Sequence, residues 1–270
     1  MATSIGMLLY PTLAATLLTL VGGKAASPIP GDREEVTVSY EVPSPRLSLG
    51  EPLVVEFRVT NSGSGEVIAD LGTNFKGNFG VTVRTPSGRM TDRLRISPPR
   101  GLVVFGRLSI PPRGEESQML VVNEWYDGFN EVGTYRIGLD LEGGFKAVGG
   151  AEVDASTTAT IEVEFTPRDQ ERLRAAAERL ASNVLTPKSV SAAFGAARAL
   201  TYVADPIGVE YSRQVLSQTT LVDLILIDGL ATLGGSEARQ VLTSLARDQG
   251  ERAVLARSAL ARLAASSSTR

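Results

Sequence analysis

The sequence predicts two domains of different fold class, an all-β antiparallel sandwich followed by an all-α stack of paired helices. Three observations carry this prediction. Short runs that alternate apolar and polar residues, separated by Gly and Pro, continue as far as Pro167. Beyond Pro167 the chain is rich in Ala, Leu and Arg, and its apolar residues recur at helical spacing. In that half Leu200, Leu230 and Leu260 stand 30 positions apart, which indicates a helix–turn–helix repeat.

Residues 1–25 are predicted to be a signal peptide. Residues 1–21 carry no charge and are mostly apolar, and Gly23-Lys24-Ala25 fits a small-x-small cleavage site, so cleavage is expected after Ala25. No Lys or Arg precedes the apolar run, which leaves an uncleaved anchor, or neither of the two, as alternatives. Residues 26–32 would be a linker. We therefore expect an extracytoplasmic protein, periplasmic or secreted, with membrane contact only if the leader is uncleaved.

Residues 33–166 are predicted to form the sandwich. The runs 34–42 and 53–60 alternate as half-buried strands around a turn at 49–52, and a hairpin-type loop follows at 61–65. Further strand-like runs lie at 67–71, 79–84, 102–110, 118–123, 134–141 and 158–165. About eight short strands at near-regular spacing, with turn residues between them, are typical of an immunoglobulin-like sandwich.

The stretch 123–137 holds the only Trp of the chain, three other aromatic residues and several acids. One interpretation is an exposed loop that binds a sugar or a peptide through Trp125, Tyr126 and Phe129. The other is structural: Trp125 plugs one end of the sandwich, and the Tyr135 hydroxyl bonds to nearby backbone as in a tyrosine corner. The acids lack the alternate spacing of a calcium loop, so no metal site is predicted.

Two sets of residues in this half resemble a known group of proteins. They are the run 47–61, Leu-Ser-Leu-Gly-Glu-Pro-Leu-Val-Val-Glu-Phe-Arg-Val-Thr-Asn, and the later Asn123-Glu-Trp-Tyr and Gly133-Thr-Tyr. They are similar to the immunoglobulin-like domains of uncharacterised exported bacterial proteins and, more distantly, to a bacterial proteinase-inhibitor-type sandwich. The resemblance covers about half of the chain and implies a fold, because no inhibitory motif matches.

Residues 167–265 are predicted to be helical, and 266–270 a disordered tail. Helices are expected from Pro167 to about Leu185, with Thr166 as cap, and over 188–203. Asp205-Pro206 is expected to cap a third helix over 205–216, and further helices are expected from about Thr220 to Leu233 and over 236–246 and 250–264. The strings 196–206 and 256–264, in which the first helix of a pair ends Ala-Leu-x-x-Leu or Val, resemble short bacterial HEAT repeats. That resemblance implies an α-solenoid with a terminal cap.

A stack of this kind exposes a concave face built from the second helix of each pair. Here that face would include Arg213, Arg239 and Arg247, giving a shallow, slightly basic groove for another protein. The alternative is that the helices merely brace the sandwich.

Composition excludes several chemistries. The chain has no Cys and no His, so disulfides, thiol nucleophiles, histidine-containing triads and the usual zinc sites are absent. Residues 26–167 carry 13 Lys/Arg against 20 Asp/Glu, and residues 168–270 carry 13 against 10. This balance does not indicate nucleic-acid binding.

We therefore predict a non-enzyme without cofactors: an exported protein-interaction or scaffold module that binds another protein. One alternative is a protease inhibitor that presents Arg100 or Arg113 on the loops 97–101 or 111–115. Another is a carbohydrate-binding protein. A paired-carboxylate enzyme would need two acids in one deep pocket, and nothing in the sequence indicates one.

Overall fold

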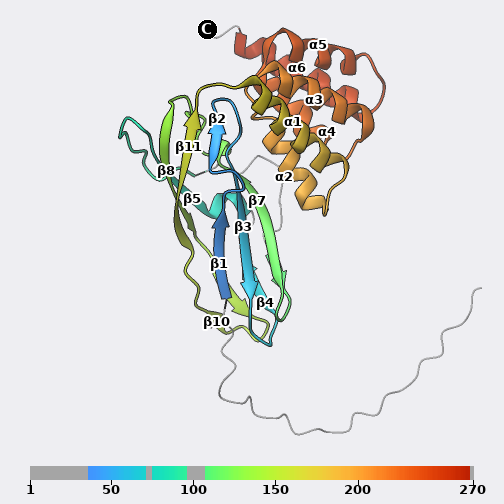
Figure 1. Ribbon diagram of the computed structural model, residues 1–270. Coiled ribbons are helices and arrows are strands. Elements are labelled where there is room, and N and C mark those ends of the chain that lie inside the picture. Colours follow the sequence, from blue (N-terminus) through green and yellow to red (C-terminus); the bar gives the residue numbers. More distant parts are fainter. Residues whose placement is uncertain (1–35, 71–74, 96–106, 268–270) are drawn as a thin grey trace, which may run out of the picture. The chain divides into compact units, whose positions relative to one another are not determined.

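A computed structural model describes residues 36–70, 75–95 and 107–267, and these belong to one compact unit, Arg33–Arg270 (Figure 1). Strands occupy its N-terminal part, and helices follow from Gln170. The predicted signal peptide, the linker, the loop 97–101 with Arg100, most of the strand at 102–110 and the last three residues of the predicted tail lie outside the described residues.

The strands form three sheets, with orders β1-β3-β7, β10-β9-β4-β6 and β2-β11-β8-β5. All pairings within these sheets are antiparallel except that of β2 with β11, which is parallel. The elements of this part are β1 (Val36–Glu41), β2 (Arg46–Ser48), β3 (Val54–Asn61), β4 (Val67–Asp70), η1 (Phe75–Asn78), β5 (Phe79–Arg84), β6 (Arg107–Ile110), β7 (Glu115–Val121), η2 (Val122–Glu124), β8 (Gly133–Leu141), β9 (Gly144–Ala147), β10 (Glu152–Val153) and β11 (Thr158–Thr166).

Alternation explains why these strands share one core. In β3 every second residue is fully buried, and Val55, Phe57 and Val59 all point inward. In β8 the same alternation buries Tyr135 and Ile137. Side chains from all three sheets meet in a single apolar cluster.

Six α-helices follow the strands among the described residues. They are α1 (Gln170–Leu185), α2 (Val190–Leu200), α3 (Pro206–Gln218), α4 (Asp223–Leu233), α5 (Gly235–Ala246) and α6 (Glu251–Ser267). Asp205 caps α3 by accepting from the Ile207 N–H, with Pro206 in the first turn, as the sequence predicted. The predicted cap of α1 is wrong: Thr166 is still in β11, and the cap is Asp169, whose carboxylate accepts from two backbone N–H groups of the first turn.

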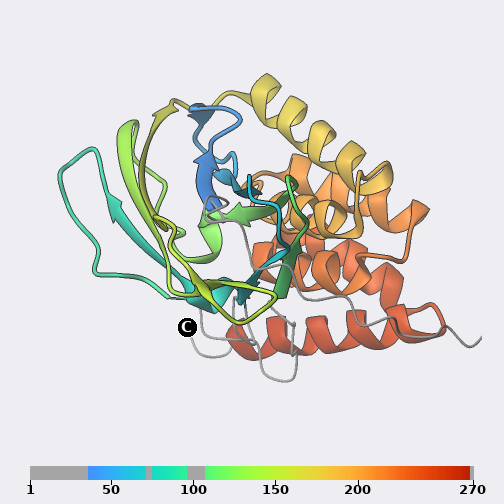
Figure 2. The same ribbon diagram turned by 90° about the horizontal axis from the view of Figure 1, so that it is seen from below.

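The helices pack on one another in two rows (Figure 2). One row is α1, α3 and α5. The other is α2, α4 and α6, in which α4 packs on both of its neighbours. Glycine permits one of these contacts: Gly229 in α4 lies directly against the Thr201 side chain at the end of α2.

Strands and helices are joined by direct packing. Helix α2 lies along β7 (Figure 1), and Val121, at the end of β7, belongs to the apolar core of the helices. A second contact involves the buried Glu51 carboxylate, which accepts from the Ser48 N–H at 2.8 Å and from Arg172 Nε at 3.1 Å. A strand residue therefore completes the core of the helices, which is separate from the core of the strands.

This arrangement corrects the predicted fold class. The chain is a mixed β and α fold, with about 30% strand in three sheets and 39% helix, rather than an immunoglobulin-like sandwich joined to a HEAT-like solenoid. Solenoid repeats contact only their neighbours in the stack. Here the first helix of the α2–α4–α6 row packs on a strand, and a strand residue completes the helical core. Local periodicity in the sequence does not reveal such long-range contacts.

Candidate interaction surface

One face of α2 is covered by β7 and by the residues that follow β7. Ser191 hydrogen-bonds to Gln118, and Arg198 pairs with Glu124 at 3.0 Å. Between these two contacts Gly195 lies against Met119, so closely that a Cβ at this position would be 2.7 Å from the Met119 Cβ. This face of α2 is therefore an internal docking surface for a strand.

The 30-residue spacing relates two positions of α2, one on this face and one beside it, to exposed positions in or just before α4 and in α6. Phe194 in α2 corresponds to Leu224 in α4 and to Val254 in α6, and their exposed fractions are 38%, 54% and 57%. Leu221, which corresponds to Ser191, is 45% exposed. We call Phe194, Leu221, Leu224 and Val254 the exposed apolar row. These residues were not predicted, although the 30-residue period that relates Leu200, Leu230 and Leu260 also relates three of the four.

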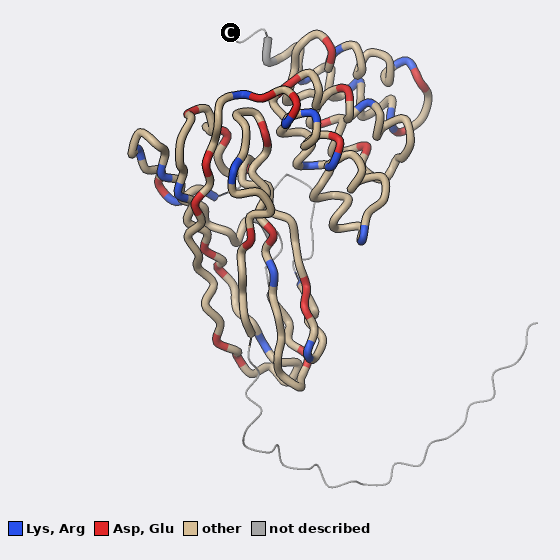
Figure 3. Tube along the Cα trace, in the orientation of Figure 1, with Lys and Arg blue, Asp and Glu red and all other residues tan. Residues whose placement is uncertain are grey.

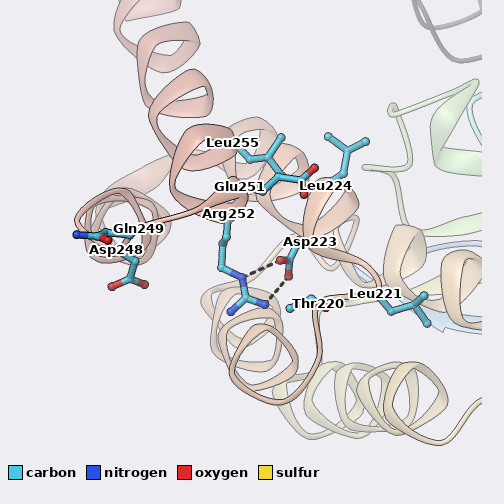
Figure 4. A pocket seen from close by; sticks show the side chains of 9 residues that line it. All are labelled: Thr220, Leu221, Asp223, Leu224, Asp248, Gln249, Glu251, Arg252 and Leu255. Carbon is cyan, nitrogen blue, oxygen red and sulfur yellow. Dashed lines mark hydrogen bonds and ion pairs between the residues drawn. The ribbon is translucent and has the colours of Figure 1, made fainter. Parts of the chain in front are cut away.

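A hollow of about 570 Å³ opens beside this row, between the starts of α4 and α6 (Figure 4). Its lining residues are Thr220, Leu221, Asp223, Leu224, Asp248, Gln249, Glu251, Arg252 and Leu255. The Arg252 guanidinium joins the two helices by donating to both Asp223 carboxylate oxygens, at 2.7 and 2.8 Å, and to the Thr219 carbonyl at 2.9 Å. This bidentate pair fixes one wall of the hollow.

The hollow is negatively charged. Three carboxylates and one guanidinium line it, so its formal net charge is −2. The hydrogen bonds that Arg252 donates to the Asp223 carboxylate raise the pKa of Arg252, and the negative charge of the nearby Asp248 acts in the same direction. Asp248 and Glu251 are exposed, and neither forms an ion pair within the described residues. Figure 3 shows acidic and basic positions interspersed along the helices, so this excess of acid is local.

The predicted aromatic site residues lie mostly in the core of the strands. Trp125 is 9% exposed and donates from Nε1 to the Phe79 carbonyl at 3.2 Å, and Phe129 is 8% exposed. Tyr126 is half-buried against Phe129, with ring centroids 4.9 Å apart. The Tyr135 hydroxyl accepts from the Glu131 N–H at 2.9 Å. These contacts agree with the structural interpretation of the loop.

The three predicted arginines lie elsewhere. Arg213 is on α3, Arg239 is on α5, and Arg247 directly follows α5; all are exposed, and none lines the hollow. They thus belong to the α1–α3–α5 row, and the structure does not bring them together with the aromatic residues or with the exposed apolar row.

The loop 111–115 is a tight turn between β6 and β7. Gly114 N–H donates to the Pro111 carbonyl at 3.0 Å, and Arg113 has a left-handed backbone, with φ of 54°. The Arg113 N–H donates to Gly63. A substrate-like inhibitory loop would be extended, so this turn does not favour the inhibitor alternative.

Within residues 36–70, 75–95 and 107–267 no group of three or more acidic side chains is placed to hold a metal ion. In the same segments no helix combines the length and the apolar character needed to cross a bilayer.

Comparison with known proteins adds slight likenesses only. No protein-family model and no curated protein matches the chain. Among solved structures, a β-glucosidase from Listeria innocua matches 49% of this chain at 17% identity, with a TM-score of 0.27, and the match spans 16% of the enzyme. A protein described as ApaA from Bordetella pertussis is 15% identical over 50% of this chain and 98% of its own, with a TM-score of 0.29. A CARDB domain from Pyrococcus furiosus, in complex with di-metal ions, is 13% identical over 52% of this chain and 95% of its own, with a TM-score of 0.24. None of these places the chain in a family or carries a functional argument, and the resemblance to exported bacterial proteins stays a prediction.

Proposed function

We propose that this chain is a non-catalytic, exported protein-interaction module that docks another protein on the exposed apolar row of α2, α4 and α6. The observation that carries this proposal is the correspondence between the covered face of α2 and the open faces of the next two helices. At the first helix of the row Ser191 bonds to β7, whereas Leu221, 30 positions after Ser191, is exposed together with Leu224 and Val254.

Leu224 and Val254 are exposed at equivalent positions of α4 and α6, which pack on each other. Burying such a patch releases about 25 cal/mol for each Å² of apolar surface, which favours association. A specific interface usually buries about 800 Å² on each partner. The exposed apolar row and the hollow beside it would supply the apolar centre of such an interface, and the surrounding charged residues its rim.

The alternatives have less support from the geometry. Sugar recognition usually needs an exposed aromatic face, and Trp125 and Phe129 are buried. An inhibitory loop would have to be extended, and the loop 111–115 is a tight turn. We therefore favour the interaction module over both.

A capture experiment with matched variants tests the proposal. The mature chain would be used as bait in the envelope fraction of its host, beside Leu224→Asp and a control, Val148→Asp. Val148 is 61% exposed in the loop after β9, so the control adds the same charge at an equally exposed site among the strands. We expect a partner that the wild type and Val148→Asp retain and Leu224→Asp loses. Retention by all three would contradict the proposed surface.

A further inference from the structure

We infer that the partner segment bound beside the exposed apolar row is a cationic amphipathic one, presenting aliphatic side chains together with Lys or Arg. This inference rests on the proposed function and names the chemistry of its partner. It follows from the hollow at the starts of α4 and α6, where apolar and acidic side chains line the same space.

The apolar part of the recognition comes from three leucines. Leu221 and Leu224 are exposed at the start of α4, and Leu255 is half-buried on α6. Figure 4 shows Leu224 and Leu255 on the same side of the Arg252–Asp223 pair, with Glu251 between them in this view. Aliphatic side chains of a partner would be removed from water here without losing hydrogen bonds, because these walls are hydrocarbon.

The charged part comes from Asp248 and Glu251. Asp223 is already held by Arg252, but the other two carboxylates form no ion pair within the described residues. Glu251 is in the first turn of α6, where a carboxylate also interacts favourably with the helix dipole. Asp248 precedes the helix, so the dipole of α6 does not account for both acids. Together they would attract a cation near the leucines.

The sign of this charge also separates partner classes. A hollow of net charge −2 repels phosphate groups, which disfavours nucleic acids and anionic lipid surfaces. The surrounding half of the chain has a small excess of Lys and Arg, 13 against 10 Asp and Glu, so the acidic character belongs to the hollow. Charge complementarity therefore points to a basic protein segment.

The test uses three synthetic peptides of about twelve residues. One alternates Leu and Lys, the second alternates Leu and Glu, and the third alternates Ser and Lys. Each is titrated into the full chain and into Glu251→Lys, Leu224→Asp and Glu152→Lys. Glu152 is exposed on β10, so its reversal changes the net charge by the same amount as Glu251→Lys, away from the hollow.

We expect the Leu–Lys peptide to bind more tightly than the other two. Glu251→Lys should weaken it roughly three- to thirtyfold, and Leu224→Asp roughly tenfold or more, whereas Glu152→Lys should change it by less than about twofold. An equal loss with Glu152→Lys would mean general attraction to the acidic chain and would overturn the inference. Binding of anionic vesicles by the wild type that Leu224→Asp abolishes would also overturn it, in favour of a membrane surface.

Failure of this inference is distinguishable from failure of the proposed function. If the Leu–Glu peptide binds as well as the Leu–Lys peptide, and Leu224→Asp still weakens both, the apolar docking surface stands and the cationic partner is wrong. If no peptide binds and Leu224→Asp captures the same proteins as the wild type, both are wrong.

Discussion

Val121 provides a sharp test of whether strands and helices form one cooperative unit. It ends β7, is fully buried, and packs in the core of the helices rather than in that of the strands. Val121→Ala removes two methyl groups, which costs about 1.6 kcal/mol of transfer free energy. Incomplete collapse around the cavity adds up to about 1 kcal/mol. We therefore expect the free energy of unfolding to fall by about 1.6–2.6 kcal/mol, or the Tm by roughly 3–10 °C for a unit of this size.

The chain supplies a separate probe for each part. Its single Trp lies in the strand core against Phe79, with ring centroids 6.5 Å apart, so its fluorescence reports on the strands. Circular dichroism at about 222 nm reports chiefly on the helices. Urea unfolding followed by both signals should give coincident transitions, and Val121→Ala should shift both equally. Val148→Ala, at an exposed position, should shift neither by more than about 0.5 kcal/mol.

A shift of the helical signal alone by Val121→Ala, with the Trp125 transition left in place, would contradict a single cooperative unit. That result would mean that the helices unfold independently and that the contact between α2 and β7 contributes little to stability.

Three further predictions concern the contacts that hold the helices. Burial raises the pKa of Asp205, but hydrogen bonds from Arg168, the Ile207 N–H and Gln170 outweigh it, so the net pKa lies below 3.8. A carboxyl group whose pKa is lowered in the folded state stabilises the fold at pH values above the ordinary carboxyl range. Asp205→Asn should therefore lower the free energy of unfolding by about 1 kcal/mol at neutral pH. In denaturant titrations the difference in unfolding free energy between Asp205→Asn and the wild type should shrink as the pH falls below 3.8. Gly229→Ala should destabilise the protein by about 1–2 kcal/mol in thermal unfolding, because the overlap of its Cβ with Thr201 costs more than alanine usually gains in a helix. The control Gly149→Ala has open space around it and should not destabilise the protein. A stabilised Gly229→Ala variant would contradict the packing of α4 on α2. Limited trypsin digestion should cut slowly after Arg168, which donates to the Ala204 carbonyl at 2.7 Å and is followed by Asp169, whose N–H donates to Ser48 Oγ at 2.7 Å; rapid release of two stable halves would show that this joint is open.

Local signals in the sequence identified most elements correctly. Alternation placed β3 within one residue of its bounds, and the Asp205-Pro206 pair located the start of α3. These features depend on neighbours within a few residues, which a single sequence displays directly. The short strands β2, β9 and β10 were missed, because two to four residues are too few for a periodic pattern.

The assembly of the elements and the candidate site were beyond the sequence. The sequence does not show that Val121 packs in the core of the helices rather than in that of the strands, because a buried valine gives the same local pattern in either core. The exposure of Phe194, Leu224 and Val254 was not predicted, because nothing local distinguishes an exposed apolar residue from a buried one. The composition of the stretch 123–137 suggested a binding loop as one interpretation, yet its aromatic rings pack mainly inside the strand core.

The most direct test of the proposed docking surface uses the absence of Cys from the chain. A single Cys introduced at Leu224, Val254 or the control position Val148 can be labelled with a benzophenone maleimide without competing thiols. The label would then be photoactivated in the host envelope fraction. The docking surface predicts one shared adduct from positions 224 and 254 and none from 148. Adducts of equal yield from all three positions, or from 148 alone, would contradict it.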